Sequence, residues 1–265
     1  MDNTQSNVPQ PVRQFKKDAL NVEIFESQPA MALNAAHTVR NYLISQLEAN
    51  GSVRAILATG NSQIQFLKTL IDLGGVDWSR VTLFHMDEYL GISETHKASF
   101  RLYMKERVES LVKPQNFHYL IGDAPLPLDE CERYSKLLQE APIDLCCLGV
   151  GENGHIAFND PPVADLRDPH LVKLVKLDDA CKIQQVNEGH FPSLEAVPPY
   201  AFTLTIPALC TAKKMICLSP ETRKAKAVQA ALEGEIGTLC PASALREQSQ
   251  ATIYLDQDSS ALLGQ

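Results

Sequence analysis

The stretch 149–162, GVGENGHIAFNDPP, combines glycines with side chains that can move a proton. Its glycines allow a tight loop that presents His155, and Asn153 and Asp160 are close enough along the chain to orient the ring. A histidine held by a carboxylate exchanges protons near neutral pH. A lone histidine is more often structural than catalytic, but the glycines before His155 and the acidic, proline-terminated turn after it favour catalysis.

The spacing G-x-G-x-x-G in the same stretch is also the fingerprint of a dinucleotide site. In such a site the last glycine opens a helix, whereas here His155 and an apolar tripeptide lead to Asp160 and two prolines. The sequence therefore argues against a dinucleotide.

Two adjacent carboxylates, Asp87 and Glu88, follow the apolar run 81–86. Carboxylates that leave a buried strand are costly to desolvate unless they have a partner or a task. At the end of a strand, Asp87 is well placed to act as a general base. The alternative, in which Asp87 caps the next segment and Glu88 faces solvent, is equally compatible with the residues alone.

Two further features suit a small anion. The first is the turn between the run 53–58 and a helical pattern, which consists of Thr59, Gly60, Asn61 and Ser62. Free N–H groups at a helix start attract phosphate, although Ser62 could simply be an N-cap. The second is a pair of cations, Arg223 and Lys224, at the start of a predicted helix, where the dipole disfavours positive charge. A bound anion would explain them, and solvated surface charge is the alternative.

The remaining histidines lack a ligand spacing such as H-E-x-x-H, so we expect no metal site. The seven cysteines are odd in number and contain no C-x-x-C pair. Free thiols in a reducing cytoplasm fit this pattern better than a disulfide framework.

Short apolar runs alternate with helical patterns along the chain. The predicted strands are 53–58, 81–86, 143–148, 171–177, 214–218 and 252–255, and the predicted helices are 64–71, 99–111, 221–232 and 243–248. This alternation predicts a Rossmann-like α/β fold, a doubly wound, mostly parallel sheet with helices on both faces. Ligands of such sheets bind beyond the carboxyl ends of the strands. We therefore expect the loops 59–62, 87–96 and 149–162 to form one site.

The composition limits the partners of the protein. Of the 265 residues, 24 are Lys or Arg and 32 are Asp or Glu, so the net charge is −8, and 45% are hydrophobic. This excludes a disordered chain and argues against nucleic acids and anionic membranes, which need basic faces. No apolar stretch approaches the roughly 18–20 residues of a membrane-spanning helix. Residues 1–20 form a polar extension without the apolar core of a signal peptide, so a single domain is expected over 21–265.

Motifs spread over the chain together resemble the glucosamine-6-phosphate isomerase/deaminase family. In the order of the family they are ATGNS (58–62), FHMDEYLG (84–91), SFRLYM (99–104), GVGENGHIAFNDPP (149–162), AFTLTIPAL (201–209), KAKAVQAALEG (224–234) and PASAL (241–245). The combination of MDEY with GHIAFN is specific, although no single motif is. The related 6-phosphogluconolactonases share the fold and the loop glycines, but usually carry DER at 87–89 and a GHTASLFP-like run from 155.

The resemblance implies conversion of an aminosugar 6-phosphate, of gluco or galacto configuration, to fructose 6-phosphate or its epimer and ammonia, without a cofactor. It implies that His155, with Asn153 and Asp160, opens the sugar ring. It also implies that Asp87 is the base that moves a proton between C2 and C1, and that loop 59–62 and Lys224 hold the phosphate.

The chain departs from the family at several positions. The family usually has Asp at position 153 and Glu at 160. Asn153 can still hydrogen-bond the imidazole but cannot stabilise its charge, so the exchange weakens ring opening or shifts the charge to Asp160. A second phosphate-binding Arg, expected in 182–190, has no secure counterpart, and 167–170 does not match the allosteric cluster of some members.

These departures leave several questions open. Allosteric activation and hexamer formation are not carried over from the family, and both a monomer and a homo-oligomer stay open. A lactonase-type hydrolase and a non-catalytic sugar-phosphate sensor stay as alternatives to the deaminase.

Overall fold

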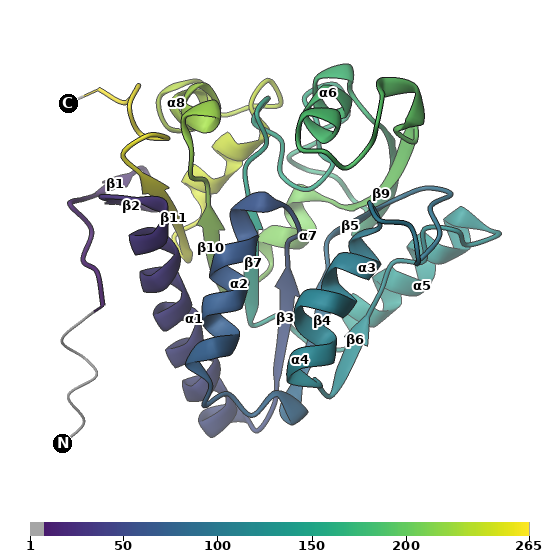
Figure 1. The fold of residues 1–265 in the computed structure, drawn as a ribbon, viewed down its shortest axis with the longest axis horizontal. Coiled ribbons are helices and arrows are strands. Elements are labelled where there is room, and N and C mark those ends of the chain that lie inside the picture. The colour runs from purple at the N-terminus through teal and green to yellow at the C-terminus, as the bar shows by residue number, and fades with distance from the viewer. Residues whose placement is uncertain (1–7, 265) are drawn as a thin grey trace.

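A computed structural model describes residues 8–264 as an α/β structure around one eight-stranded sheet (Figure 1). The strands lie in the order β1-β2-β11-β10-β7-β3-β4-β6, and every neighbouring pair is parallel except β1 and β2. Their bounds are Arg13–Lys17 (β1), Leu20–Phe25 (β2), Val53–Leu57 (β3), Val81–His85 (β4), Asn116–His118 (β6), Leu145–Gly149 (β7), Lys214–Leu218 (β10) and Ala251–Asp256 (β11).

Helices cover both faces of this sheet because successive strand residues point to opposite sides. In β3, Val53 and Leu57 pack with α1 and α2, which lie side by side in Figure 1, while Ile56 packs on the opposite face with α5, α7 and α8. The helices are Gln28–Asn50 (α1), Asn61–Leu73 (α2), Phe100–Met104 (α3), Ser110–Val112 (α4), Pro127–Gln139 (α5), Asp179–Asn187 (α6), Ile206–Cys210 (α7) and Ala225–Glu233 (α8).

A second sheet of three antiparallel strands lies beside the first. It consists of β5 (Asp87–Tyr89), β9 (Tyr200–Leu204) and β8 (Val172–Lys176), in that order. This sheet corrects the expectation that 171–177 belongs to the parallel sheet, because that strand pairs antiparallel with β9. The chain passes from β8 into α6, so the second sheet determines where α6 lies.

The predicted fold class is confirmed. All six predicted strands are present within a residue or two of their expected bounds. The helix expected over 99–111 is broken into α3, a π-helical turn and α4, and 243–248 lies in a 3₁₀ helix, Pro241–Glu247, and not in an α-helix. Helices α1, α5, α6 and α7 and strands β1, β2, β5, β6 and β9 are additional to the predicted elements.

The N-terminal boundary drawn at residue 20 falls inside a β-hairpin. β1 lies within the predicted extension and pairs with β2, which joins the sheet through β11. Residues 1–7 of that extension lie outside the described part of the chain. Among residues 8–264, no helix is long and apolar enough to cross a membrane.

The site-forming end of the sheet follows from its topology. From β3 the chain proceeds to β4 on one side, whereas β7, on the other side of β3, continues to β10 and β11. Loops that leave such neighbouring strands in opposite directions open a crevice between them. The crevice here lies between the loop after β3 and the loop after β7.

Candidate functional site

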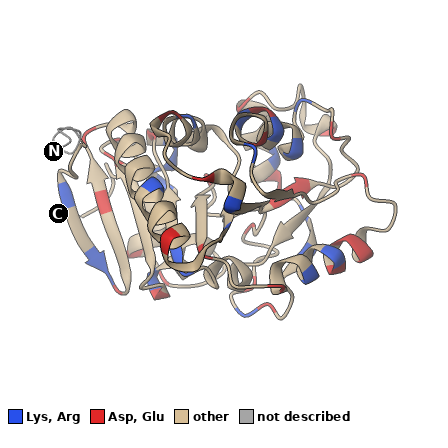
Figure 2. Cartoon of the chain, turned by 90° about the horizontal axis from the view of Figure 1, so that it is seen from below, with Lys and Arg blue, Asp and Glu red and all other residues tan. Residues whose placement is uncertain are grey.

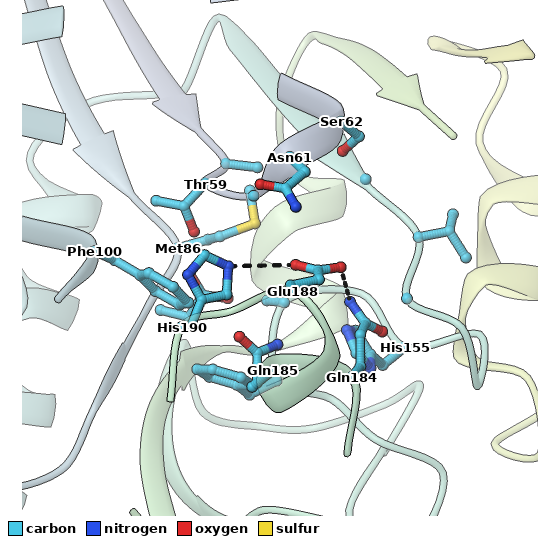
Figure 3. Close-up of a pocket in the computed structure, with 18 of the residues that line it drawn as sticks. Thr59, Asn61, Ser62, Met86, Phe100, His155, Gln184, Gln185, Glu188 and His190 are labelled. Carbon is cyan, nitrogen blue, oxygen red and sulfur yellow. Dashed lines mark hydrogen bonds and ion pairs between the residues drawn. The ribbon is translucent and has the colours of Figure 1, made fainter. Parts of the chain in front are cut away.

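A pocket opens at the carboxyl edge of the parallel sheet, where the loops after β3, β4, β7 and β10 meet (Figure 3). The sequence-predicted residues that line it are Thr59, Gly60, Asn61, Ser62, Asp87, His155 and Lys224. The other two predicted residues hold His155: Asn153 accepts its backbone N–H, and Asp160 pairs with its ring. All three predicted loops therefore contribute to one pocket.

His155 is paired with a buried carboxylate. Its Nδ1 atom lies 2.9 Å from Oδ1 of Asp160, which has no solvent exposure. Burial raises the pKa of Asp160, but hydrogen bonds from His155, from Asn153 and from the backbone N–H of Asp178 outweigh it, so that the pKa lies below its usual range. Asp160 is therefore a permanent negative charge behind the ring, which leaves Nε2 to exchange a proton with a ligand.

Asn153 makes no hydrogen bond to the imidazole, which corrects the expectation that it hydrogen-bonds the ring. Its Nδ2 donates to Asp160 Oδ1 over 3.0 Å, and its Oδ1 accepts the backbone N–H of His155 over 3.1 Å. The charge that supports His155 is thus supplied by Asp160, and Asn153 holds that carboxylate in place. The amide is suited to this because a second carboxylate could not donate to Asp160.

The glycines of this loop make room for the histidine. A Cβ atom at position 151 would lie 2.2 Å from the His155 ring, and Gly154 has a φ of +84°, which side chains with a Cβ rarely adopt. The G-x-G-x-x-G spacing is therefore explained by a tight turn, closed by the bond from Gly151 N–H to the His155 carbonyl.

The two neighbouring carboxylates after β4 differ in environment. Asp87 lines the pocket with 7% exposure, and its Oδ1 has no hydrogen-bond partner within residues 8–264. Burial, together with the nearby charge of Glu88, raises the pKa of Asp87 well above its usual value. A carboxyl group with a raised pKa is a stronger base once ionised, so Asp87 can take a proton from a bound ligand.

Glu88 is structural, which reverses the alternative reading in which Asp87 caps and Glu88 faces solvent. It is fully buried, accepts the backbone N–H groups of Phe100 and Arg101 over 3.1 and 3.0 Å, and accepts the Ser99 hydroxyl over 2.7 Å. Its Oε2 also lies 3.4 Å from Nε of the buried Arg101. Glu88 therefore anchors the start of α3.

Glu88→Ala should destabilise the fold, because it leaves the Ser99 hydroxyl and the N–H groups at the start of α3 without their buried acceptor and removes the ion-pair partner of Arg101 Nε. Loss of one partner of a buried pair costs about 3–5 kcal/mol, measurable as a lower urea midpoint. Glu94→Ala is the control: it breaks an ion pair with Lys105 at 2.7 Å whose side chains are about half exposed, and should change the midpoint little. Equal midpoints for both variants would contradict this role of Glu88.

The turn after β3 presents backbone N–H groups to the pocket. Gly60, with φ +107°, is the N-cap of α2, and because it has no side chain, it offers no side-chain oxygen to cap the first N–H groups of the helix. Ser62 lies inside the helix, so it is not the N-cap that the alternative reading required. The first N–H groups of a helix have no intrahelical partner, and no acidic residue occupies the first turn of α2. This end of the pocket is suited to an anion.

Lys224 lies in the 3₁₀ turn Thr222–Lys224 that precedes α8, and it lines the pocket with 4% exposure. Its ammonium group has no hydrogen bond or ion pair within the described residues. Burial, and secondly the charge of Arg223, lowers its pKa to about 8, against the opposing effect of nearby glutamates. A largely desolvated cation without a partner is what an anion-binding pocket requires.

One wall of the pocket was not predicted. It is formed by Gln184, Gln185, Glu188 and His190, from α6 and the turn after it. Figure 3 shows Glu188 between His190 and Gln184: it accepts from Gln184 Nε2 over 3.0 Å and lies 3.4 Å from His190 Nε2. No signal in the sequence indicated that this segment belongs to the site, because α6 follows β8 of the second sheet and not a strand of the parallel sheet.

One group of side chains could be compared with a metal site. Ligand atoms of His155, Asp160 and Cys181 lie within 4.8 Å of one another. Burial, and then the charge of Asp160, holds the pKa of the Cys181 thiol well above its usual value, so the thiolate that a metal binds is disfavoured. The group is explained by hydrogen bonding to Asp160, and we assign it no metal.

The fold and the pocket together define a doubly wound α/β protein with one pocket at the switch point of its sheet, lined by residues whose chemistry suits an anion and proton transfer. The chain belongs to the family described as glucosamine-6-phosphate isomerases/6-phosphogluconolactonase, whose model matches residues 26–254. The resemblance drawn from the sequence motifs is confirmed.

The similar proteins include glucosamine-6-phosphate deaminases and 6-phosphogluconolactonases. A glucosamine-6-phosphate deaminase from Bacillus cytotoxicus is 31% identical over 243 residues, which are 92% of this chain and 89% of that protein. The solved structure of a monomeric glucosamine-6-phosphate deaminase has a TM-score of 0.84 at 28% identity and covers 91% of this chain and 99% of its own. A 6-phosphogluconolactonase from Shewanella baltica has a TM-score of 0.73 at 16% identity, over 89% and 96% of the two chains, and so shares the fold.

Proposed function

We propose that this protein converts glucosamine 6-phosphate and water to fructose 6-phosphate and ammonia. The observation that carries the proposal is the arrangement of one pocket. It contains a carboxylate-backed histidine, a desolvated free aspartate and an anion site made of a helix start and Lys224. The names of the relatives support the same substrate.

The histidine would act first. Its Nε2 would donate a proton to the ring oxygen of the sugar as the C1–O bond breaks, and take one from the C1 hydroxyl. The negative charge of Asp160 would stabilise the imidazolium form while the proton is in transit. No other group is required for ring opening.

Asp87 would then move a proton from C2 to C1. Removal of the C2 proton, with transfer of one ammonium proton to the C1 oxygen, gives an enolamine. Return of the first proton to C1 then gives a protonated imine at C2, which water hydrolyses to the ketose and an ammonium ion. The substrate ammonium at C2 would stabilise the ionised form of Asp87, whose pKa burial alone raises. Binding of the correct substrate would thereby produce the base.

A three-substrate assay tests the proposal. Purified protein is incubated with glucosamine 6-phosphate, galactosamine 6-phosphate and 6-phosphogluconolactone, and the release of ammonia and of acid is followed. We expect ammonia from glucosamine 6-phosphate at the highest rate. Rapid lactone hydrolysis without ammonia from either aminosugar would establish the lactonase alternative, and binding without turnover of any of them would establish the sensor.

The phosphate role of Lys224 predicts a dependence on pH. Because the pKa of Lys224 is about 8, the ammonium loses its proton as the pH rises through that value. The Kd for fructose 6-phosphate, which carries no amine of its own, should therefore rise above pH 8, by at most about tenfold per pH unit. Lys224→Arg keeps the cation charged and should shift this rise beyond pH 10. An unshifted rise in that variant would remove Lys224 from the phosphate site.

A further inference from the structure

The guanidinium of Arg223 is fixed by three carboxylates. Its Nε donates to Glu221 Oε2 over 2.5 Å, and its Nη1 donates to Glu152 Oε1 over 3.1 Å and to Glu188 Oε1. These glutamates belong to three separate segments, which are the turn before α8, the loop that carries His155, and the turn after α6. Such an arrangement holds the plane of the guanidinium in one orientation.

The third guanidinium nitrogen of Arg223, Nη2, has no such partner in the described part of the chain. Nη2 makes no hydrogen bond to any described residue, although Arg223 lines the pocket and its side chain is only 28% exposed. The next residue in the chain is Lys224, whose buried ammonium also has no partner in the described structure. Arg223 and Lys224 thus both line the pocket, and each carries a donor without a partner among residues 8–264.

Glu188 is the most constrained of the three carboxylates. Its side chain is 7% exposed, Oε1 accepts from Gln184 as well as from Arg223, and Oε2 faces His190. Burial raises the pKa of Glu188, but the bonds from His190 and Arg223 lower it to about 2, so that it stays ionised. With its oxygens already engaged, Glu188 is suited to hold Arg223 and not to contact a ligand.

We propose that Arg223 donates its free Nη2 to the phosphate group of the substrate, beside Lys224, and that Glu188 is the positioning residue that aims it. This rests on the proposed function, since it places the phosphate at the end of the pocket formed by loop 59–62 and Lys224. It also explains how the wall that contains Glu188 can accept an anion, because the charge of Glu188 is neutralised by its ion pair with Arg223.

The test measures the binding of inorganic phosphate and of fructose 6-phosphate by calorimetry, independently of turnover. Arg223→Gln should raise both Kd values at least tenfold, and should raise KM for glucosamine 6-phosphate more than it lowers kcat. Lys226→Ala is the matched control, because Lys226 is an exposed cation two residues beyond Lys224 that does not line the pocket. It should leave both Kd values within twofold of the wild type.

A double variant separates direct contact from charge balance. Arg223→Gln alone also leaves its three glutamates unneutralised near Lys224, with the buried Glu188 foremost, which would weaken anion binding without any contact to Arg223. In Arg223→Gln with Glu188→Gln both charges are removed, and we expect the Kd for phosphate to stay at least tenfold raised. Recovery to within twofold of the wild type would overturn the proposal.

Two further variants complete the test. If Arg223→Gln does not fold, Arg223→Lys, which keeps the charge and loses the fork, should still raise both Kd values at least threefold, and unchanged values would count against the proposal. If Lys224→Ala raises the Kd for phosphate and the Arg223 variants do not, the proposed function survives and this inference fails. If none of them does, the phosphate site of the proposed function is itself wrong.

Discussion

Asp87→Asn should lower kcat by about 10²–10⁴-fold, the range that a general base contributes. The amide is nearly isosteric with the carboxylate, but it cannot take the C2 proton. The Kd for fructose 6-phosphate should stay within about threefold of the wild type, because Asp87 is not part of the anion-binding end of the pocket. Initial rates of ammonia release and calorimetric titration of the two proteins give these values.

The comparison of kcat between Asp87→Asn and the wild type requires that the variant is folded. Asp87 is buried with an unpartnered oxygen and a raised pKa, so removal of its charge should leave the urea midpoint equal to or above that of the wild type. Wild-type turnover in Asp87→Asn would exclude Asp87 as the base. Loss of turnover together with loss of fructose 6-phosphate binding would assign it a structural role.

Asn153→Asp should reduce activity, even though the family usually has aspartate there. The Asn153 amide donates to Asp160 over 3.0 Å, so an aspartate would place two buried carboxylate oxygens at that distance. Two carboxylates so close cannot both stay ionised, and the pKa of the pair rises. The carboxylate charge beside Nδ1 of His155 is then partly neutralised, and kcat should fall about tenfold or more, a part of the roughly 10²–10⁴-fold that general acid–base catalysis contributes.

The double variant Asn153→Asp with Asp160→Asn distinguishes this mechanism from simple misfolding. It restores one carboxylate and one amide in exchanged positions, so the repulsion disappears, although the charge now lies farther from the ring. Activity should recover part of the loss seen in Asn153→Asp alone. A gain of activity in the single variant would show instead that Asn153 marks a weakened catalyst.

The sequence was most informative at the ends of parallel strands. The loops after β3, β4 and β7 could be assigned to one site because strands of a parallel sheet end at a common edge. His155 and Asp87 were placed at the pocket in this way, whereas Lys224 was predicted from the two cations at the start of a helix. The choice between the two readings of Asp87 and Glu88, with Glu88 holding the start of α3, could not be made from the sequence, because the side of a strand end that faces α3 depends on tertiary packing.

The wall formed by α6 could not be predicted from the sequence either. Its position depends on β8, whose apolar pattern fits either sheet, and only the antiparallel pairing with β9 places Glu188 against Arg223. The net charge of −8 gave no sign of this wall. Figure 2 shows acidic and basic residues interspersed along the chain, so the positive charge for a phosphate has to be local.

The most direct test of the account is the stoichiometry of the reaction with glucosamine 6-phosphate. Ammonia and fructose 6-phosphate are measured together over time with purified wild-type protein, and Asp87→Asn provides the background. We expect one ammonia released for each fructose 6-phosphate formed by the wild-type protein, and both products should form at least about 10²-fold more slowly in the variant. Absence of both products with the wild-type protein, or their formation at equal rates in both proteins, would contradict it.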